Sequence, residues 1–150
     1  MFSGEKLVIN LNLSGKRAVV TGASLGIGAA IVKTLAEHGA QVEFCARSAD
    51  AVSALTTDKN IVGHTADMGN QESTENFIQR VLDSGPVDIL INNVGASPSR
   101  NFLYMSDDDW RDLHELNLLS AVRCTRAFLQ GMREKKSGRV VMISSSAGKY

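Results

Sequence analysis

The sequence predicts an α/β fold in which helices cover both faces of a parallel β-sheet. Short apolar runs alternate with longer amphipathic runs along the chain, an order typical of parallel strands joined by right-handed crossover helices. A glycine-rich turn between Gly22 and Gly28 joins the first apolar run to the first amphipathic run. The alternation and the turn together indicate a doubly wound sheet of the Rossmann type.

The apolar runs are expected to form the strands, because each has the composition of a strand buried on both faces. They cover residues 17–21, 41–45, 61–65, 87–92 and 139–144. Helices are expected over residues 26–38, 49–55, 70–83 and 107–136. Asn70 is expected to cap the third helix, and Gly85 followed by Pro86 to end it. Residues 1–150 are therefore expected to form a single dinucleotide-binding domain.

The last helix places one amide side chain on an apolar face. A buried amide needs hydrogen-bond partners or costs about 1–3 kcal/mol. Asn117 is therefore expected either to make a structural hydrogen bond or to belong to a functional site. The expected inner face contains Leu113, Leu116, Asn117, Ser120, Cys124, Phe128 and Leu129, and the arginines expected to point outward are Arg123, Arg126 and Arg133.

The glycine turn has the spacing that a dinucleotide site requires. Gly22 allows a tight turn out of the strand, Gly26 leaves room for a pyrophosphate, and Gly28 allows close packing of the helix. The unpaired amides of the first helical turn would then face the phosphates. The cleft is expected at the carboxyl ends of the first and fourth strands, where Gly95 also lies.

Residues 21–28 have the pattern TGxxxGxG, which resembles the glycine motif of the short-chain dehydrogenase/reductase family. Asp67 stands where that family places an aspartate beside the adenine. Residues 92–95, NNVG, resemble the family's NNAG, and residues 143–146 resemble the strand that carries its catalytic serine. Asn117 follows in the matching helix. The resemblance implies strand order 3-2-1-4-5, truncated before the family's last strands.

The same resemblance implies reversible hydride transfer between a nicotinamide cofactor and a carbonyl or secondary-alcohol substrate. Ser145 would bind the substrate oxygen, and Asn117 would support a water molecule in the proton relay. The family's catalytic Tyr-x-x-x-Lys follows its serine by about a dozen residues, whereas Tyr150 follows Ser145 closely. Tyr150 is therefore interpreted as a loop residue, with an unusually early catalytic tyrosine as the alternative. The chain alone is expected to lack oxidoreductase activity.

The end of the second strand favours NADP over NAD. An acidic residue here binds the ribose hydroxyls of NAD, whereas an arginine accommodates the 2′-phosphate of NADP. Ala46 and Arg47 fit the NADP pattern. Leu25 argues for NAD, since many NADP-using members of the family carry a basic residue there. The expected cofactor-binding residues are Thr21, Gly22, Ser24, Leu25, Gly26, Ile27, Gly28, Arg47, Ser48, Asp67, Met68, Asn93, Val94 and Gly95.

The acidic residues are explained without a metal. Asp67 is expected to contact the cofactor, with capping of the following helix as the alternative. Asp107, Asp108 and Asp109 begin the last helix, where the helix dipole favours negative charge. Neither a second cluster of oxygen ligands nor a ligand-like histidine spacing accompanies them, so no metal site is expected.

Composition indicates an ordinary globular protein, with 43% hydrophobic and 21% charged residues. The 16 basic and 16 acidic residues cancel, so neither nucleic acid nor a membrane is expected as a partner. Cys45 and Cys124 are isolated in apolar surroundings, which indicates buried thiols in a reducing compartment. A cytoplasmic location is the resulting expectation.

The last apolar run, residues 139–143, predicts association with another chain. The family fold would cover this strand with a further strand and helix, so a homo-oligomer or a docked C-terminal segment is expected. A non-catalytic nucleotide-binding or assembly module is the alternative function. The missing Tyr-x-x-x-Lys favours that module, whereas Ser145 and Asn117 favour the enzyme.

Overall fold

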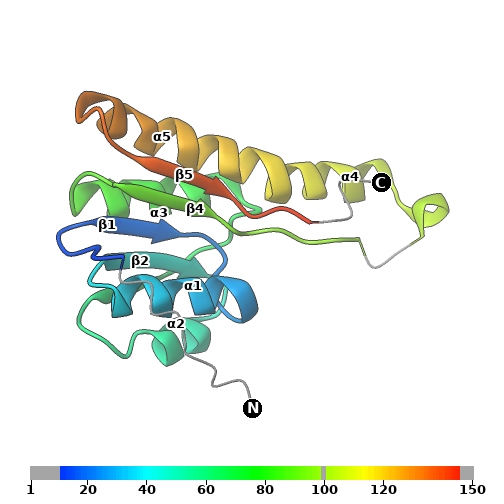
Figure 1. The fold of residues 1–150 in the computed structure, drawn as a ribbon. Coiled ribbons are helices and arrows are strands. Elements are labelled where there is room, and N and C mark those ends of the chain that lie inside the picture. Colours follow the sequence, from blue (N-terminus) through cyan, green and yellow to red (C-terminus); the bar gives the residue numbers. More distant parts are fainter. Residues whose placement is uncertain (1–10, 99–100, 146–150) are drawn as a thin grey trace, which may run out of the picture.

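The computed structural model of the protein describes residues 11–98 and 101–145 (Figure 1). Its centre is a five-stranded sheet in the order β3-β2-β1-β4-β5, and every neighbouring pair is parallel. This arrangement confirms the predicted doubly wound sheet and its strand order. The strands are β1 (Arg17–Val20), β2 (Gln41–Ala46), β3 (Ile61–Thr65), β4 (Ile89–Asn92) and β5 (Arg139–Met142).

Helices connect the strands and lie on both faces of the sheet (Figure 1). They are α1 (Gly26–Glu37), α2 (Ala49–Leu55), α3 (Gln71–Asp83), α4 (Asp107–His114) and α5 (Ser120–Glu134), with a short 3₁₀ turn η1 (Phe102–Tyr104) and a π-helical turn η2 (Glu115–Leu119). None of the helices in the described residues combines the length and the apolar character needed to span a bilayer.

Successive strand residues contribute to two separate hydrophobic cores. Val19 packs with Phe77 of α3 and Phe128 of α5 on one face of the sheet. Val20 packs with Val32 of α1 on the other. Side chains alternate between the faces of a strand, so both faces of the central strands are covered. The cores therefore fix the ends of β1 and β4 side by side, where the glycine turn begins.

The structure corrects the predicted start of β4. This strand begins at Ile89, although the sequence predicts a start at Val87, which is also buried. Pro86 has no N–H to donate to a neighbouring strand. The Asp88 carboxylate, instead of a backbone carbonyl, accepts a 3.0 Å hydrogen bond from the Arg17 N–H. Similarly, β1 ends at Val20 and β5 at Met142, before the predicted ends.

The helix predicted over residues 107–136 is interrupted at η2. The Ser120 N–H donates to the carbonyl of Glu115, five residues back, and its hydroxyl donates to the Leu116 carbonyl at 2.6 Å. The fully buried Ser120 side chain thus satisfies a carbonyl at the irregular turn. Hydrophobic periodicity does not reveal this interruption, because apolar residues still recur at helical spacing on either side.

Two side chains of α5 therefore lie differently from the prediction. The buried stripe is narrow, with its members four residues apart at Ser120, Cys124, Phe128 and Met132. Leu129, expected on the inner face, is 41% exposed. Arg123, expected to point outward, is largely buried in an ion pair with Glu115. The charge of an arginine does not exclude burial when a carboxylate lies opposite.

The edge strand β5 is exposed although its composition predicts burial. Val140, Val141 and Met142 expose 36%, 41% and 54% of their surface. In the described part of the chain, β5 pairs only with β4. An apolar sequence is therefore not sufficient for burial, which also needs a neighbouring element to cover the strand.

Candidate cofactor site

A cleft of about 280 Å³ opens at the carboxyl ends of the central strands, where the sequence predicts a cofactor. It brings together most of the predicted cofactor-binding residues. The cleft is lined by Gly22, Ser24, Leu25, Ile27, Gly28, Cys45, Ala46, Arg47, Ala66, Asp67, Met68, Asn93, Val94, Gly95, Ala96 and Leu116.

The glycines of the turn are required by its geometry. Gly22 has φ of +68°, and a β-carbon there would lie 2.8 Å from the Cα of Val94. A β-carbon on Gly28 would lie 2.5 Å from the Asn93 amide nitrogen and 2.7 Å from the Gly22 carbonyl. Both positions are closed to larger residues. The turn therefore packs directly against the segment that follows β4.

Gly26 has a different environment, which suits a ligand. Its φ is +58°, and a β-carbon there would meet nothing within 4 Å apart from its chain neighbours and its own helix backbone. Gly26 itself does not line the cleft, but its neighbours Leu25 and Ile27 do. Leu25 is the N-cap of α1, and it makes no side-chain hydrogen bond to the first turn of that helix. The amides at the start of α1 thus lack a side-chain cap beside an open space, an arrangement that favours an anionic group.

Thr21 and Asn93 hold the turn against β4 from behind. The Thr21 hydroxyl accepts hydrogen bonds from the N–H groups of Asn93 and Val94, at 3.1 and 3.2 Å. The Asn93 amide donates to the carbonyls of Thr21 and Gly22, at 3.0 and 2.8 Å. Thr21 is buried and does not line the cleft, so its observed role is to support the turn.

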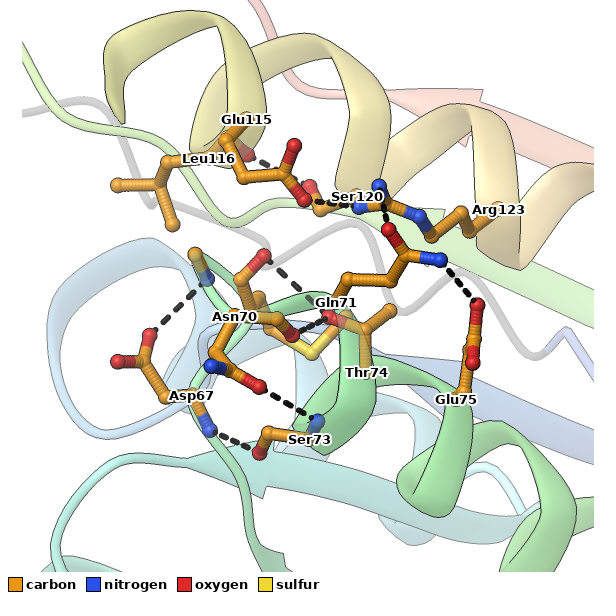
Figure 2. A network of polar contacts seen from close by, with 12 residues as sticks. Asp67, Asn70, Gln71, Ser73, Thr74, Glu75, Glu115, Leu116, Ser120 and Arg123 are labelled. Atoms are coloured by element: carbon orange, nitrogen blue, oxygen red, sulfur yellow. Dashed lines mark hydrogen bonds and ion pairs between the residues drawn. The ribbon is translucent and has the colours of Figure 1, made fainter. Parts of the chain in front are cut away.

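Asp67 lies in a tight turn that leads into α3 (Figure 2). The Gly69 N–H donates to Asp67 Oδ1 at 2.9 Å. The cap of α3 is Asn70, whose Oδ1 accepts from the Ser73 N–H at 2.9 Å, as the sequence predicts. The alternative role of Asp67 as the helix cap is therefore filled by another residue. Its carboxylate is exposed and lines the cleft.

The residues that follow β2 divide between the cleft and a helix cap. Arg47 is exposed and lines the cleft. The Ser48 hydroxyl accepts a 3.4 Å hydrogen bond from the Ala51 N–H and caps α2, and Ser48 does not line the cleft. The sequence predicts Ser48 in the site, but its side chain caps the adjacent helix.

Asn117 belongs to the wall of the cleft through the backbone of Ala96. Its Nδ2 donates to the Ala96 carbonyl, and its Oδ1 accepts from the Ala96 N–H, both at 2.8 Å. The residue is exposed, although the sequence predicts burial. Because η2 shifts the helix surface here, Asn117 satisfies its amide on a neighbouring loop rather than inside the core. The sequence leaves open whether Asn117 makes a structural hydrogen bond or belongs to a functional site, and the observed bonds to Ala96 are structural.

Ser145 lies three residues after the end of β5, at the same edge of the sheet. The chain leaving β5 stays beside β4, since the Ile143 N–H donates to the Asn92 carbonyl at 2.9 Å. Ser145 is exposed and does not line the cleft. Tyr150 lies outside the described residues.

Sequence reasoning missed several lining residues, chiefly small ones at strand ends. Cys45 and Ala66 lie just before or after predicted motif residues, and their small side chains give no chemical signal. Leu116 is next to Asn117 and could have been found by that proximity. The Cys45 thiol is buried, and burial raises its pKa to about 12, so it is a poor nucleophile.

Two other features were considered as sites. A larger groove of about 890 Å³ lies between α5 and β5, lined by residues such as Val122, Leu129 and Met142, and it contains none of the predicted site residues. Within residues 11–98 and 101–145, no three His, Cys, Asp or Glu side chains gather closely enough to hold a metal ion. The glycine turn therefore remains the candidate site.

Comparison with known proteins finds related oxidoreductases. The 3-oxoacyl-[acyl-carrier-protein] reductase FabG of Vibrio cholerae is 40% identical over 141 residues, which are 92% of this chain and 58% of that protein. An uncharacterized oxidoreductase of Bacillus subtilis, YvaG, is 39% identical over 147 residues, 93% of this chain and 54% of that protein. The chain thus spans little more than half the length of these curated relatives.

Solved structures share the fold. A metagenomic short-chain oxidoreductase in complex with NADP matches with a TM-score of 0.85 and 34% identity, covering 93% of this chain and 66% of the other. A short-chain dehydrogenase from Streptomyces avermitilis matches with a TM-score of 0.84 and 36% identity, covering 90% and 51%. The family model described as short chain dehydrogenase matches residues 16–150. By sequence and by fold, the chain belongs to the short-chain dehydrogenase family.

Proposed function

We propose that this protein is an NADP(H)-dependent oxidoreductase that reduces a carbonyl or oxidises a secondary alcohol. The observation that carries the proposal is the glycine turn, which places open space and the uncapped start of α1 at one end of the cleft. Support also comes from the names of the relatives, which are oxidoreductases, and from a structural neighbour in complex with NADP.

The residues of the cleft fit a dinucleotide. The amides at the start of α1 would bind the pyrophosphate beside Gly26. Asp67 and Met68 would hold the adenine, and Arg47 would bind the 2′-phosphate of NADP through charge-assisted hydrogen bonds. The nicotinamide, when bound, supplies or accepts the hydride. The preference for NADP over NAD rests on Arg47 and on the absence of an acidic side chain at Ala46.

Ser145 would hydrogen-bond the substrate oxygen as negative charge develops on it. Asn117 would contribute by keeping Ala96 in place and by supporting the proton relay. A general acid is still required for carbonyl reduction. The chain spans little more than half the length of its curated relatives. We propose that a segment corresponding to the rest of their length supplies the acid and its lysine.

The proposal also covers the substrate, the partners and the location of the protein. The substrate would be a small carbonyl or alcohol compound, with no nucleic acid or membrane as partner. The protein would work as a homo-oligomer, or with the additional segment docked against β5, in the cytoplasm. The buried free thiols of Cys45 and Cys124 are compatible with a reducing compartment.

A complementation experiment tests the function. The purified 150-residue chain is mixed with a fragment carrying the missing tyrosine and lysine, and NADPH oxidation is followed with a panel of ketones. We expect turnover only in the mixture. Turnover by the chain alone at an enzymatic rate would contradict the proposed division of labour.

A non-catalytic nucleotide-binding module is the second candidate, because the cleft and the glycine turn account for nucleotide binding without any chemistry. NADPH fluorescence titration separates the two together with the mixing experiment. A module would bind NADPH and stay inactive with every fragment, whereas the enzyme would both bind and turn over.

A further inference from the structure

An ion pair secures the π-helical turn from behind the cleft. Arg123 of α5 pairs with Glu115, the first residue of η2, and their side chains are only 12% and 24% exposed. Glu115 begins η2 and Arg123 lies four residues after its end at Leu119, so the pair spans the irregular turn. Neither residue lines the cleft.

The same guanidinium reaches a third element (Figure 2). Arg123 Nη2 donates to Oε1 of Gln71, the first residue of α3, at 3.3 Å. The Gln71 amide in turn donates to Glu75 Oε1 at 2.8 Å, which fixes the orientation of its oxygen toward Arg123. Arg123 therefore connects α5 and η2 with the start of α3.

Each connected element carries one wall of the cleft. On the η2 side, Leu116 lines the cleft and Asn117 binds both backbone groups of Ala96. On the α3 side, the wall is the turn that contains Asp67, whose N–H donates to the Ser73 hydroxyl of α3 at 2.9 Å. The two walls thus depend on elements that Arg123 holds together.

The walls also lie close together. A β-carbon placed on Gly69 would be only 3.7 Å from Cδ1 of Leu116. A shift of η2 relative to α3 would therefore move Leu116 toward or away from the Asp67 turn and change the width of the cleft at this end.

We propose that Arg123, together with Glu115, is a positioning residue that sets the separation of the two cleft walls and thereby the affinity for the dinucleotide. The proposal rests on the proposed function for its ligand. Arginine suits this task because its planar fork binds the Glu115 carboxylate and the Gln71 oxygen at once, which a lysine ammonium does less well. Without the guanidinium, η2 loses its hydrogen-bonded link to the start of α3, while the apolar packing of α3 against α5 remains.

The first measurement needs no cofactor. Amide hydrogen exchange is compared in the wild-type chain, in Arg123→Met and in Arg126→Met, an exposed arginine of the same helix as the matched control. In Arg123→Met we expect the Ala96 amide to exchange about 3- to 30-fold faster. The amide of Val42 in β2 should not change. Unchanged exchange at Ala96, or an equal increase at Val42, would overturn the proposal.

The second measurement links the contacts of Arg123 to cofactor binding. NADPH titration should give a dissociation constant about 3- to 30-fold higher for Arg123→Met. Arg123→Lys should restore part of the affinity, and Arg126→Met should match the wild type. Faster exchange at Ala96 with unaltered NADPH affinity would overturn the role in setting the cleft. If the wild-type chain does not bind NADPH, the proposed function fails. Exchange at Ala96 still decides whether Arg123 holds the two walls in position.

A milder variant protects the test against misfolding. Gln71→Leu removes the hydrogen bond from Arg123 to α3 and leaves the Arg123–Glu115 ion pair intact. We expect the same direction of change at Ala96 and in NADPH affinity. Wild-type values for both in this folded variant would contradict a link between the two walls.

Discussion

At the scale of single residues, polar side chains in this site hold backbone in place more often than they face the cleft. The side chains of Thr21 and Asn117 both form hydrogen bonds with neighbouring main-chain groups. Exposed groups such as Arg47, Asp67 and Ser24 line the cleft instead and are available to a ligand. Mutations in these two groups of residues should therefore have different signatures, in stability and in binding respectively.

Thr21→Val tests the supporting role. The valine leaves the N–H groups of Asn93 and Val94 without their acceptor in a buried place, so we expect the free energy of unfolding to fall by about 1–3 kcal/mol. Urea denaturation measures the change. Thr21→Ser keeps the hydroxyl and should retain most of the stability; equal losses in both variants would point to packing of the methyl group instead.

Arg47→Ala tests the choice of cofactor. A charge-assisted hydrogen bond contributes about 1.5–3 kcal/mol, so loss of the guanidinium should weaken NADPH binding by roughly 10- to 150-fold. NADH lacks the 2′-phosphate and should bind as before, which makes it the internal control in a fluorescence titration. Equal loss for both cofactors would show that Arg47 does not bind the phosphate.

At the scale of elements, turns and networks join helices to strands. In the turn from β3 to α3, helix capping and contact with the cleft belong to different residues, although the sequence alone allowed both roles for Asp67. Asn70 caps the helix and Asp67 lines the cleft. Asn70→Ala should therefore cost about 1 kcal/mol of stability. Asp67→Ala should lower dinucleotide affinity and keep the melting temperature of the empty protein within a few degrees. Calorimetry and titration on both variants distinguish the roles, and a reversed pattern would exchange them.

A buried charge network joins β1, β2 and β3. Burial raises the pKa of Glu43, but hydrogen bonds from His64 and Arg17 and their positive charges outweigh burial, so the net pKa lies below its usual value. Because the folded-state pKa is lowered, the stability that Glu43 contributes is complete above its unfolded pKa of about 4.3. That stability is lost as the pH falls through the lower folded-state value.

Glu43→Gln tests this network. At pH 7 the variant leaves the partly buried Arg17 without its carboxylate, and we expect a loss of about 3 kcal/mol. The difference from wild type should shrink as the pH falls from 7 toward 3, because protonation makes the wild-type side chain neutral as well. Free energies of unfolding of both proteins, measured between pH 7 and pH 3, test this expected pH dependence. A difference independent of pH would mean that shape, and not charge, matters at Glu43.

At the scale of the whole molecule, the apolar surface is unevenly covered. The strand β5 exposes Val140, Val141 and Met142, and Met142 also lines the groove beside α5 together with Leu129. Exposed apolar edge strands recruit other chains. We expect the 150-residue chain to self-associate in sedimentation experiments, and Val141→Lys to shift it toward monomer. A monodisperse wild-type monomer would contradict this expectation.

The order of strands and helices followed from the sequence because each element has its own hydrophobic period. Alternation alone fixed a parallel sheet, and the glycine spacing of residues 21–28 located the cleft, since only glycine satisfies a positive φ and a close backbone approach at those points. Asn70 was identifiable as a cap for the same local reason. These features depend on neighbours along the chain.

Contacts between distant segments were decided only by the tertiary structure. The π turn η2, the pairing of Arg123 with Glu115 and Gln71, and the hold of Asn117 on Ala96 arise from helix packing against a loop and another helix. Hydrophobic periodicity records which side of a helix is apolar, but it does not record which carboxylate or carbonyl lies opposite a polar side chain. The supporting residues behind the cleft therefore became visible only when the elements were packed together.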